Sequence, residues 1–162
     1  MATYSLTVET TSNNTASATA GAATAIQALM PASREMRLLA VLINQNATAA
    51  GETPGRWVMD VISAVATGSA KTPTKLTTVG AASAITDTTI AISTTLACAP
   101  TAATSAIIDL AIGVWNIFSG IEQGGLPRMR SGLNQGFAIR RATAPTGARV
   151  CAITMIWEED PT

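Results

Sequence analysis

Apolar side chains near the end of this sequence recur at every second position, and that spacing limits the possible folds more than any other feature. In residues 149–157 both alternating sets are largely apolar. A repeat of two is typical of a β-strand, whose successive side chains point to opposite faces. A strand without a polar face needs cover on both sides. One set holds Cys151, Ile153, Met155 and Trp157, and the other holds Val150, Ala152, Thr154 and Ile156.

The same alternation predicts further strands along most of the chain. Glycine, proline, asparagine and threonine separate the apolar segments, as expected for turns. Pro73 cannot donate a hydrogen bond to a neighbouring strand, so its segment is predicted to lie at a sheet edge. The last two strands, with Pro145 and Gly147 between them, are predicted to form a hairpin. The predicted strand segments are 34–43, 56–66, 71–80, 86–94, 105–118 and the two within 136–159.

The segment 105–118 is ambiguous, because its apolar residues fall at nearly every position. Such a pattern fits either a buried helix or a buried strand over residues 106–118. Its β-branched residues and Gly113 favour the strand. Two alanine-rich stretches, 16–29 and 79–84, also leave a helix open, because alanine has the highest helix propensity.

The first 33 residues are rich in alanine, threonine, serine and asparagine. We expect residues 1–33 to form an N-terminal arm, or a first strand and a linker, and residues 34–162 to form one domain. About eight short strands with almost no amphipathic helix predict an all-β fold, an antiparallel sandwich of the jelly-roll type. Cys98 and Cys151 are too few and too far apart for a disulfide framework, so both are expected to be small buried residues.

Charge is sparse and balanced. The net charge is zero and 12% of residues are charged, about half the roughly 25% usual in soluble domains. A nucleic-acid-binding protein needs a basic face to neutralise phosphates, so we expect no nucleic-acid partner. A surface with so little charge is poorly soluble unless partners cover part of it, which indicates an oligomer or a component of an assembly.

Residues suited to catalysis are scarce. The sequence has no histidine, which removes the commonest general base and metal ligand. Asp60 and Asp109 each interrupt an apolar strand and could form a glycosidase pair, but an outward position or a pairing with an arginine such as Arg141 is the preferred interpretation. The acidic run 158–160 is interpreted as a solvated tail rather than a calcium site. We therefore expect no enzyme activity, cofactor, metal or small-molecule substrate.

Targeting and membrane segments are also not expected. The first cation is Arg34, so the opening residues do not resemble a secretory leader, and synthesis in a cytoplasm is expected. Residues 88–108 carry no charge, but serine, threonine and Pro100 interrupt their apolar character. A membrane span is therefore not predicted there.

Several features together resemble a known family. They are a strand opened by Arg34, a strand with Trp57, the segment "TPTKL", a second tryptophan strand "GVWNIFSG", the loop "GGLP" and the ending "WEE". Over residues 34–159 the chain resembles the small jelly-roll capsid decoration, or cement, proteins of tailed bacteriophages. The resemblance implies a homotrimer on the outer surface of an icosahedral capsid in the virion, bound to the major capsid protein and clamping neighbouring capsomers.

The resemblance implies contacts between chains, and no catalytic residue. Candidate contact residues for the subunit or capsid interface are Tyr4, Leu6, Val8, Trp115 and Trp157; the tryptophans, Trp57 included, suit either the core or an interface. An alternative is the trimeric head of a phage fibre or tail that binds a host receptor glycan. Such a site needs exposed aromatic and acidic residues in the end loops, and the sequence places few there.

Overall fold

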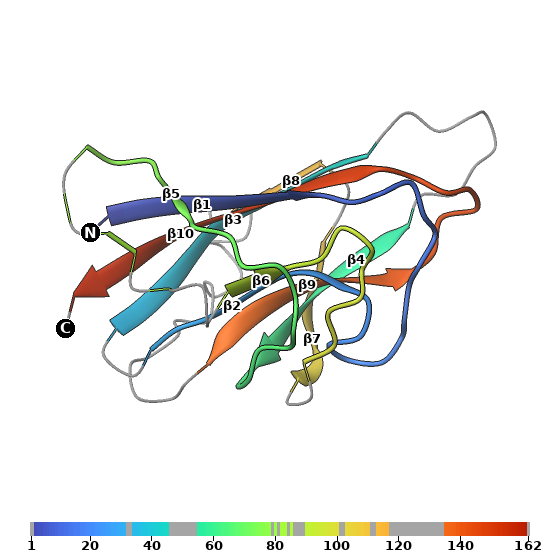
Figure 1. Cartoon of the computed structure of the whole chain (residues 1–162), viewed down its shortest axis with the longest axis horizontal. Coiled ribbons are helices and arrows are strands. Elements are labelled where there is room, and N and C mark those ends of the chain that lie inside the picture. The colour runs from blue at the N-terminus through green and yellow to red at the C-terminus, as the bar shows by residue number, and fades with distance from the viewer. Residues whose placement is uncertain are drawn as a thin grey trace.

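The strands that the structure describes belong to two layers (Figure 1). The computed structural model describes residues 2–31, 34–45, 55–78, 80, 82–83, 85, 90–100, 103–110, 113–116 and 135–161. These ranges contain strands and no helix, and so no helix with the length and hydropathy to cross a membrane. The strands are β1 (Ala2–Glu9), β2 (Thr24–Leu29), β3 (Arg34–Gln45), β4 (Arg56–Ile62), β5 (Thr74–Lys75), β6 (Ile90–Ile92), β7 (Ala103–Leu110), β8 (Gly113–Asn116), β9 (Gly136–Thr143) and β10 (Cys151–Pro161).

The strand order confirms the predicted antiparallel, jelly-roll-like sandwich. The first sheet has the order β5-β1-β10-β3-β8, and the second has the order β6-β2-β9-β4-β7. The short strands β5 and β6 extend one edge of each sheet. Without them, β1, β10, β3 and β8 face β2, β9, β4 and β7, and most connections pass from one sheet to the other. Two four-stranded sheets joined in this way form the double Greek key of a jelly roll.

The beginning of the chain is part of both sheets. Strand β1 pairs with β10 over its full length, from Ala2 opposite Glu159 to Glu9 opposite Ala152. Strand β2 lies between β6 and β9 in the second sheet. Residues 2–9 and 24–29 are therefore not an arm separate from the sandwich. Residues 1–33 are expected to form either an arm or a first strand and a linker. The structure shows the first strand, β1, and a second strand, β2, in the same segment.

The alternation seen in the sequence places one face of each strand in the core. In β1, alternate residues from Ala2 to Val8 are buried, and the residues between them are partly or fully exposed. In β10 the buried set begins with Cys151, Ile153 and Met155. The largest core side chains are aromatic, and the rings of Tyr4 and Trp157 stack with their centroids 6.1 Å apart. The aromatic core residues are Tyr4, Trp57, Phe137 and Trp157.

The structure corrects two connections and resolves the ambiguous segment. Residues 103–110 and 113–116 are strands, as favoured for 106–118, but β7 and β8 belong to different sheets; residues 117–118 lie outside the described ranges. The predicted hairpin within 136–159 is wrong, because β9 and β10 also lie in different sheets. Turn residues mark where a strand ends but not which strand it joins, and 144–150 is long enough to cross the roughly 10 Å between layers.

Two isoleucines of β10 test this arrangement, because they lie on opposite faces of one strand. Ile153 is fully buried between the sheets, whereas Ile156 is partly exposed. We expect Ile153→Ala to lower the free energy of unfolding by about 2–5 kcal/mol, because it leaves a cavity in the core. In dilute protein the matched variant Ile156→Ala should lose much less. Urea titration of both variants measures the difference, and equal losses would contradict the assignment of faces.

Candidate interaction surface

The outer face of the second sheet is covered by the chain itself. Side chains of β2, β4 and β9 that point away from the core are nonetheless buried, including Gln27, Val58, Asp60, Ile62 and Ala138. Two segments lie against this face and are tied to it by hydrogen bonds. One is the end of the connection between β1 and β2, residues 17–21, and the other is the stretch after β4 that contains Ala66.

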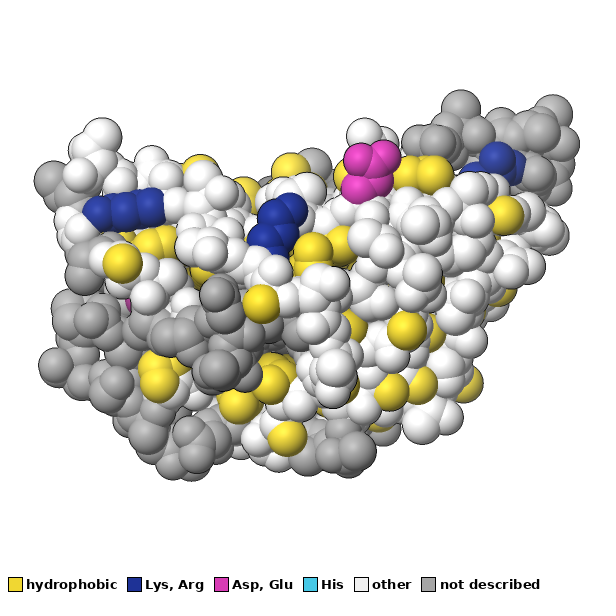
Figure 2. All heavy atoms as spheres, viewed as in Figure 1, with side chains coloured by type: hydrophobic (Ala, Val, Ile, Leu, Met, Phe, Trp, Pro, Cys, Tyr) yellow, Lys and Arg dark blue, Asp and Glu magenta, His cyan; other side chains and the backbone are white. Residues whose placement is uncertain are grey.

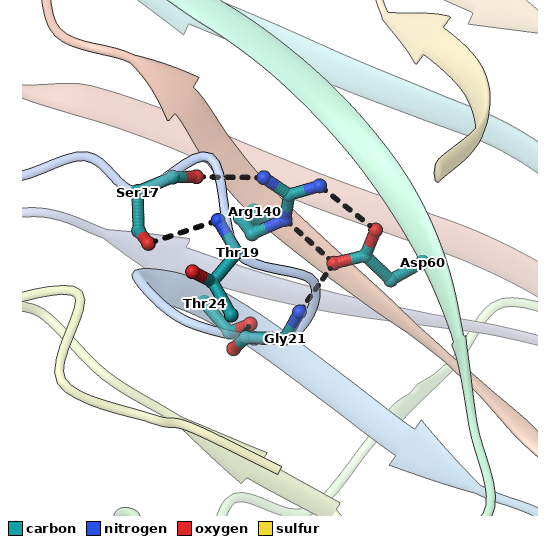
Figure 3. Close-up of polar contacts among 6 residues, drawn as sticks. All are labelled: Ser17, Thr19, Gly21, Thr24, Asp60 and Arg140. Atoms are coloured by element: carbon teal, nitrogen blue, oxygen red, sulfur yellow. Dashed lines mark hydrogen bonds and ion pairs between the residues drawn. The ribbon is translucent and has the colours of Figure 1, made fainter. Parts of the chain in front are cut away.

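A buried ion pair holds the first of these segments (Figure 3). Arg140 of β9 donates from Nε to Oδ2 of Asp60 at 2.6 Å and from Nη2 to Oδ1 at 3.1 Å. The same carboxylate accepts the backbone N–H of Gly21 at 2.7 Å, and Nη1 of Arg140 donates to the carbonyl of Ser17 at 2.6 Å. Gly21 adopts a φ of 77°, which favours glycine. The ion pair therefore fixes the covering segment as well as two neighbouring strands.

A buried glutamine holds the second segment. Gln27 of β2 donates from Nε2 to the carbonyl of Ala66 at 2.8 Å, and its Oε1 accepts the N–H of Ala66 at 2.9 Å. Both polar groups of the amide are thus satisfied by one backbone residue. Burial of the amide without these partners would be unfavourable, so residue 66 stays close to the sheet.

The outer face of the first sheet has no such cover among the described residues. Each outward side chain of β1, β3 and β10 whose burial the structure describes is partly or fully exposed. The middle of this face is uncharged: Thr7 lies opposite Thr154, with their Oγ1 atoms 2.8 Å apart, and Ile156 lies opposite Ala40. We call this surface the open face. It consists of Thr3, Ser5, Thr7, Glu9, Arg37, Leu39, Ala40, Leu42, Asn44, Ala152, Thr154, Ile156 and Glu158.

The charge that the open face does carry lies at its two ends. Glu158 and Arg37 are paired in register at one end, and Glu9 lies at the other. Sparse charge is also evident on the side of the molecule in Figure 2, where basic and acidic side chains are few and well separated among uncharged ones. An uncharged centre bordered by charged residues is the usual anatomy of a protein–protein interface.

The predicted contact residues are not on the open face. Tyr4, Leu6, Val8 and Trp157 are buried in the core, each with an exposed fraction of at most 2%. They occupy the core-facing positions of β1 and β10, so the single chain does not offer them to a partner. Trp115 lies in β8 opposite Val41, and its side chain is outside the described part. Of the two roles considered for the tryptophans, Trp57 and Trp157 have the core role.

Sequence reasoning chose the apolar set of β1, Tyr4, Leu6 and Val8, as contact residues, and the structure buries that set between the sheets. The residues that the open face presents are the small polar ones between them, such as Thr7, and the second set of β10. The alternation contained this information, because an apolar set and a Ser/Thr set on one strand indicate one buried and one open face.

The acidic residues considered for chemistry have structural contacts. Asp60 pairs with Arg140 rather than Arg141, and Asp109 lies on the adjacent strand, in register with Val58. Arg141 points to the core, where its guanidinium lies 4.9 Å from the ring centroid of Trp57 and donates to the carbonyl of Asn13 at 3.0 Å. Within the described ranges, no group of three acidic or cysteine side chains is placed to hold a metal ion.

The acidic run at the end of the chain is not a solvated tail. Glu159 is part of β10 and is buried, and its Oε1 accepts hydrogen bonds from Nε1 of Trp157, at 3.1 Å, and from Oγ of Ser83. The carboxylate thus satisfies the indole N–H at the edge of the core. Alternation explains the result, because Glu159 belongs to the same buried set as Trp157.

Neither cysteine is in a disulfide. Cys98 and Cys151 are free and buried, as predicted. Burial raises the pKa of both thiols; the nearby Arg141 guanidinium opposes this for Cys151, and a hydrogen bond with Ser93 opposes it for Cys98, without overcoming the effect of burial. Both side chains therefore remain neutral thiols at physiological pH, which suits packing rather than nucleophilic chemistry.

Comparison with known proteins gives no match: no family model matches the sequence, and no curated protein or solved structure is significantly similar to it.

Removal of the Asp60 carboxylate tests the structural role of the ion pair. Asp60→Asn leaves the buried Arg140 guanidinium without its counter-charge, and we expect a loss of about 3–5 kcal/mol in the free energy of unfolding. The double variant Asp60→Leu, Arg140→Met removes both charges and should lose less than the single variant. Urea titration measures both, with the exposed Glu9→Gln as a control. A single variant as stable as the control would contradict this role.

Thiol labelling tests the burial of the cysteines. At pH 8 a raised pKa and burial both lower the reactivity of Cys98 and Cys151 towards Ellman's reagent. Folded protein should react at least about 100-fold more slowly than protein in denaturant, because labelling requires local opening. Two thiols should then react on unfolding. Rapid labelling of the folded protein would show that at least one thiol is accessible.

Proposed function

We propose that this protein is a capsid decoration, or cement, protein of a tailed bacteriophage. In this proposal it acts as a homotrimer on the outer surface of the icosahedral capsid, where it binds the major capsid protein and stabilises contacts between capsomers. The observation that carries the proposal is the open face, a sheet surface with an uncharged centre, on a sandwich whose other sheet buries most of its described outward side chains on β2, β4 and β9. A face of this kind suits contact with other protein chains.

Physical requirements of a lattice-clamping protein support the proposal. Such a protein needs a rigid body, and the two sheets, with polar side chains fixing the covering segments, meet that requirement. It also needs contacts that are individually modest and numerous, because repeated copies on a shell add their binding energies. A low-charge face avoids the desolvation cost of burying ions at each contact.

The described side chains that catalysis or glycan binding would need already have contacts within the chain. Asp60, the carboxylate considered for catalysis, is fully buried in its ion pair with Arg140. A fibre head that binds glycans needs exposed aromatic rings, and the aromatic side chains that the structure describes, those of Tyr4, Trp57, Phe137 and Trp157, are buried. These contacts favour a structural role over catalysis and over receptor binding.

Sedimentation with capsids tests the proposed function. Heads of the phage that encodes the protein, expanded and stripped of it, should bind the purified protein at symmetry-related sites and become more resistant to heat or chelator. Thr154→Arg adds a long charged side chain to the centre of the open face and should weaken binding. Thr94→Arg changes an exposed threonine in the loop after β6, outside the open face, and serves as the matched control.

Two outcomes would contradict the proposal. One is a protein that does not bind heads at any concentration. The other is a protein that binds heads equally well with Thr154→Arg and Thr94→Arg, since the open face would then have no part in binding. Specific retention on host glycans, without head binding, would favour the fibre-head alternative.

A further inference from the structure

Opposite charges occupy diagonally opposite corners of the open face. Glu9 lies at the end of β1, in register with Ala152 of the central strand β10. Arg37 lies on β3, on the other side of β10, in register with Glu158. Neither Glu9 nor Arg37 forms an ion pair with another described residue. Each is therefore available to a charge on another molecule.

The midpoint between these two charges falls on the uncharged centre of the face. Along β10, the position halfway between Ala152 and Glu158 is Met155, whose outward neighbours are Thr154 and Ile156. A twofold axis lying in the face and passing over this point exchanges the two corners. It would bring Arg37 of one copy to Glu9 of the other, twice per contact, while the uncharged centres meet.

Glu158, the other charged residue of the face whose side chain the structure describes, fits the same operation. An axis that exchanges Glu9 and Arg37 also carries Glu158 towards the outer side of β1. There Nζ of Lys71 lies 2.6 Å from the carbonyl oxygen of Thr7, to which it donates. The second acidic residue of the face thus approaches a lysine rather than another carboxylate. Among the described side chains the surface is complementary to itself in charge, and neutral threonine, alanine, leucine and isoleucine side chains fill the middle.

We propose that the open face binds a second copy of this chain about a twofold axis, with Arg37 of each copy paired to Glu9 of the other. The inference names the partner of the open face, and it rests on the proposed function only in taking that face as a contact surface. Thr154→Arg then weakens head binding because it removes the contact between neighbouring copies on the shell. A twofold contact joins copies in pairs, so it is additional to the threefold contact of the proposed trimer and would join one trimer to the next.

Charge reversal tests this pairing. Sedimentation equilibrium of the full chain, from micromolar to millimolar concentration, should show paired units for the wild type: dimers of single chains, or hexamers where trimers form. Glu9→Lys and Arg37→Glu each place like charges together twice per contact, and each should weaken association by about tenfold or more. The double variant keeps the wild-type net charge, restores both pairs and should recover association to near the wild-type value. Circular dichroism melts establish that all variants are folded.

The outcomes separate this inference from the proposed function. Recovery in the double variant, together with a smaller effect of the single reversals in high salt, supports the pairing. Association that is unchanged by the single reversals, or not recovered by the double variant, overturns it. A wild type that forms only trimers also overturns it, but agrees with the proposed decoration function. A wild type that is monomeric throughout overturns both the pairing and the trimer, and head binding then decides the decoration function alone.

Discussion

A sandwich buries one face of each sheet, so the other face of each sheet is either covered by another part of the chain or open to solvent and partners. The buried polar contacts and the candidate contact surface of this protein both follow from what happens to these two outer faces. The second sheet buries most of its described outward side chains beneath the segments at 17–21 and near residue 66. The first sheet keeps small polar and apolar residues on its outer side and has no described cover. The asymmetry between the sheets is the basis for assigning the contact surface.

Two adjacent arginines show how the chain keeps polar groups in an apolar fold. Arg140 and Arg141 point to opposite faces of β9, as neighbours in a strand must. Arg140 shares the carboxylate of Asp60 with the backbone of the covering segment, while Arg141 stacks on Trp57 between the sheets. Burial of an ion pair contributes little net stability compared with apolar packing, but loss of one partner is costly. The pair therefore specifies where the segment lies more than it stabilises the fold.

Alternation was enough to predict the fold class, because period-two patterns with turn residues between them identify strands without knowledge of their partners. The alternation also indicated which face of a strand is buried: on β1 the apolar Tyr4 lies in the core and the polar Thr7 is exposed. It could not predict that β9 and β10 belong to different sheets, because strand pairing depends on contacts distant in sequence. Nor could it choose between Arg140 and Arg141 as the partner of Asp60, since that choice depends on the register of β4 against β9, which puts Asp60 opposite Ala138 and so on the same face as Arg140.

Hydroxyl-radical footprinting of the protein, alone and assembled, tests most directly whether the open face is a contact surface. In dilute protein Ile156 and Leu42 should be oxidised, because their side chains are partly exposed, while Ile153 and Met155 should be protected in the core. On assembly, with itself or on a capsid, Ile156 and Leu42 should become protected and the core residues should not change. Equal oxidation of Ile156 and Leu42 in the dilute and assembled protein would contradict the account.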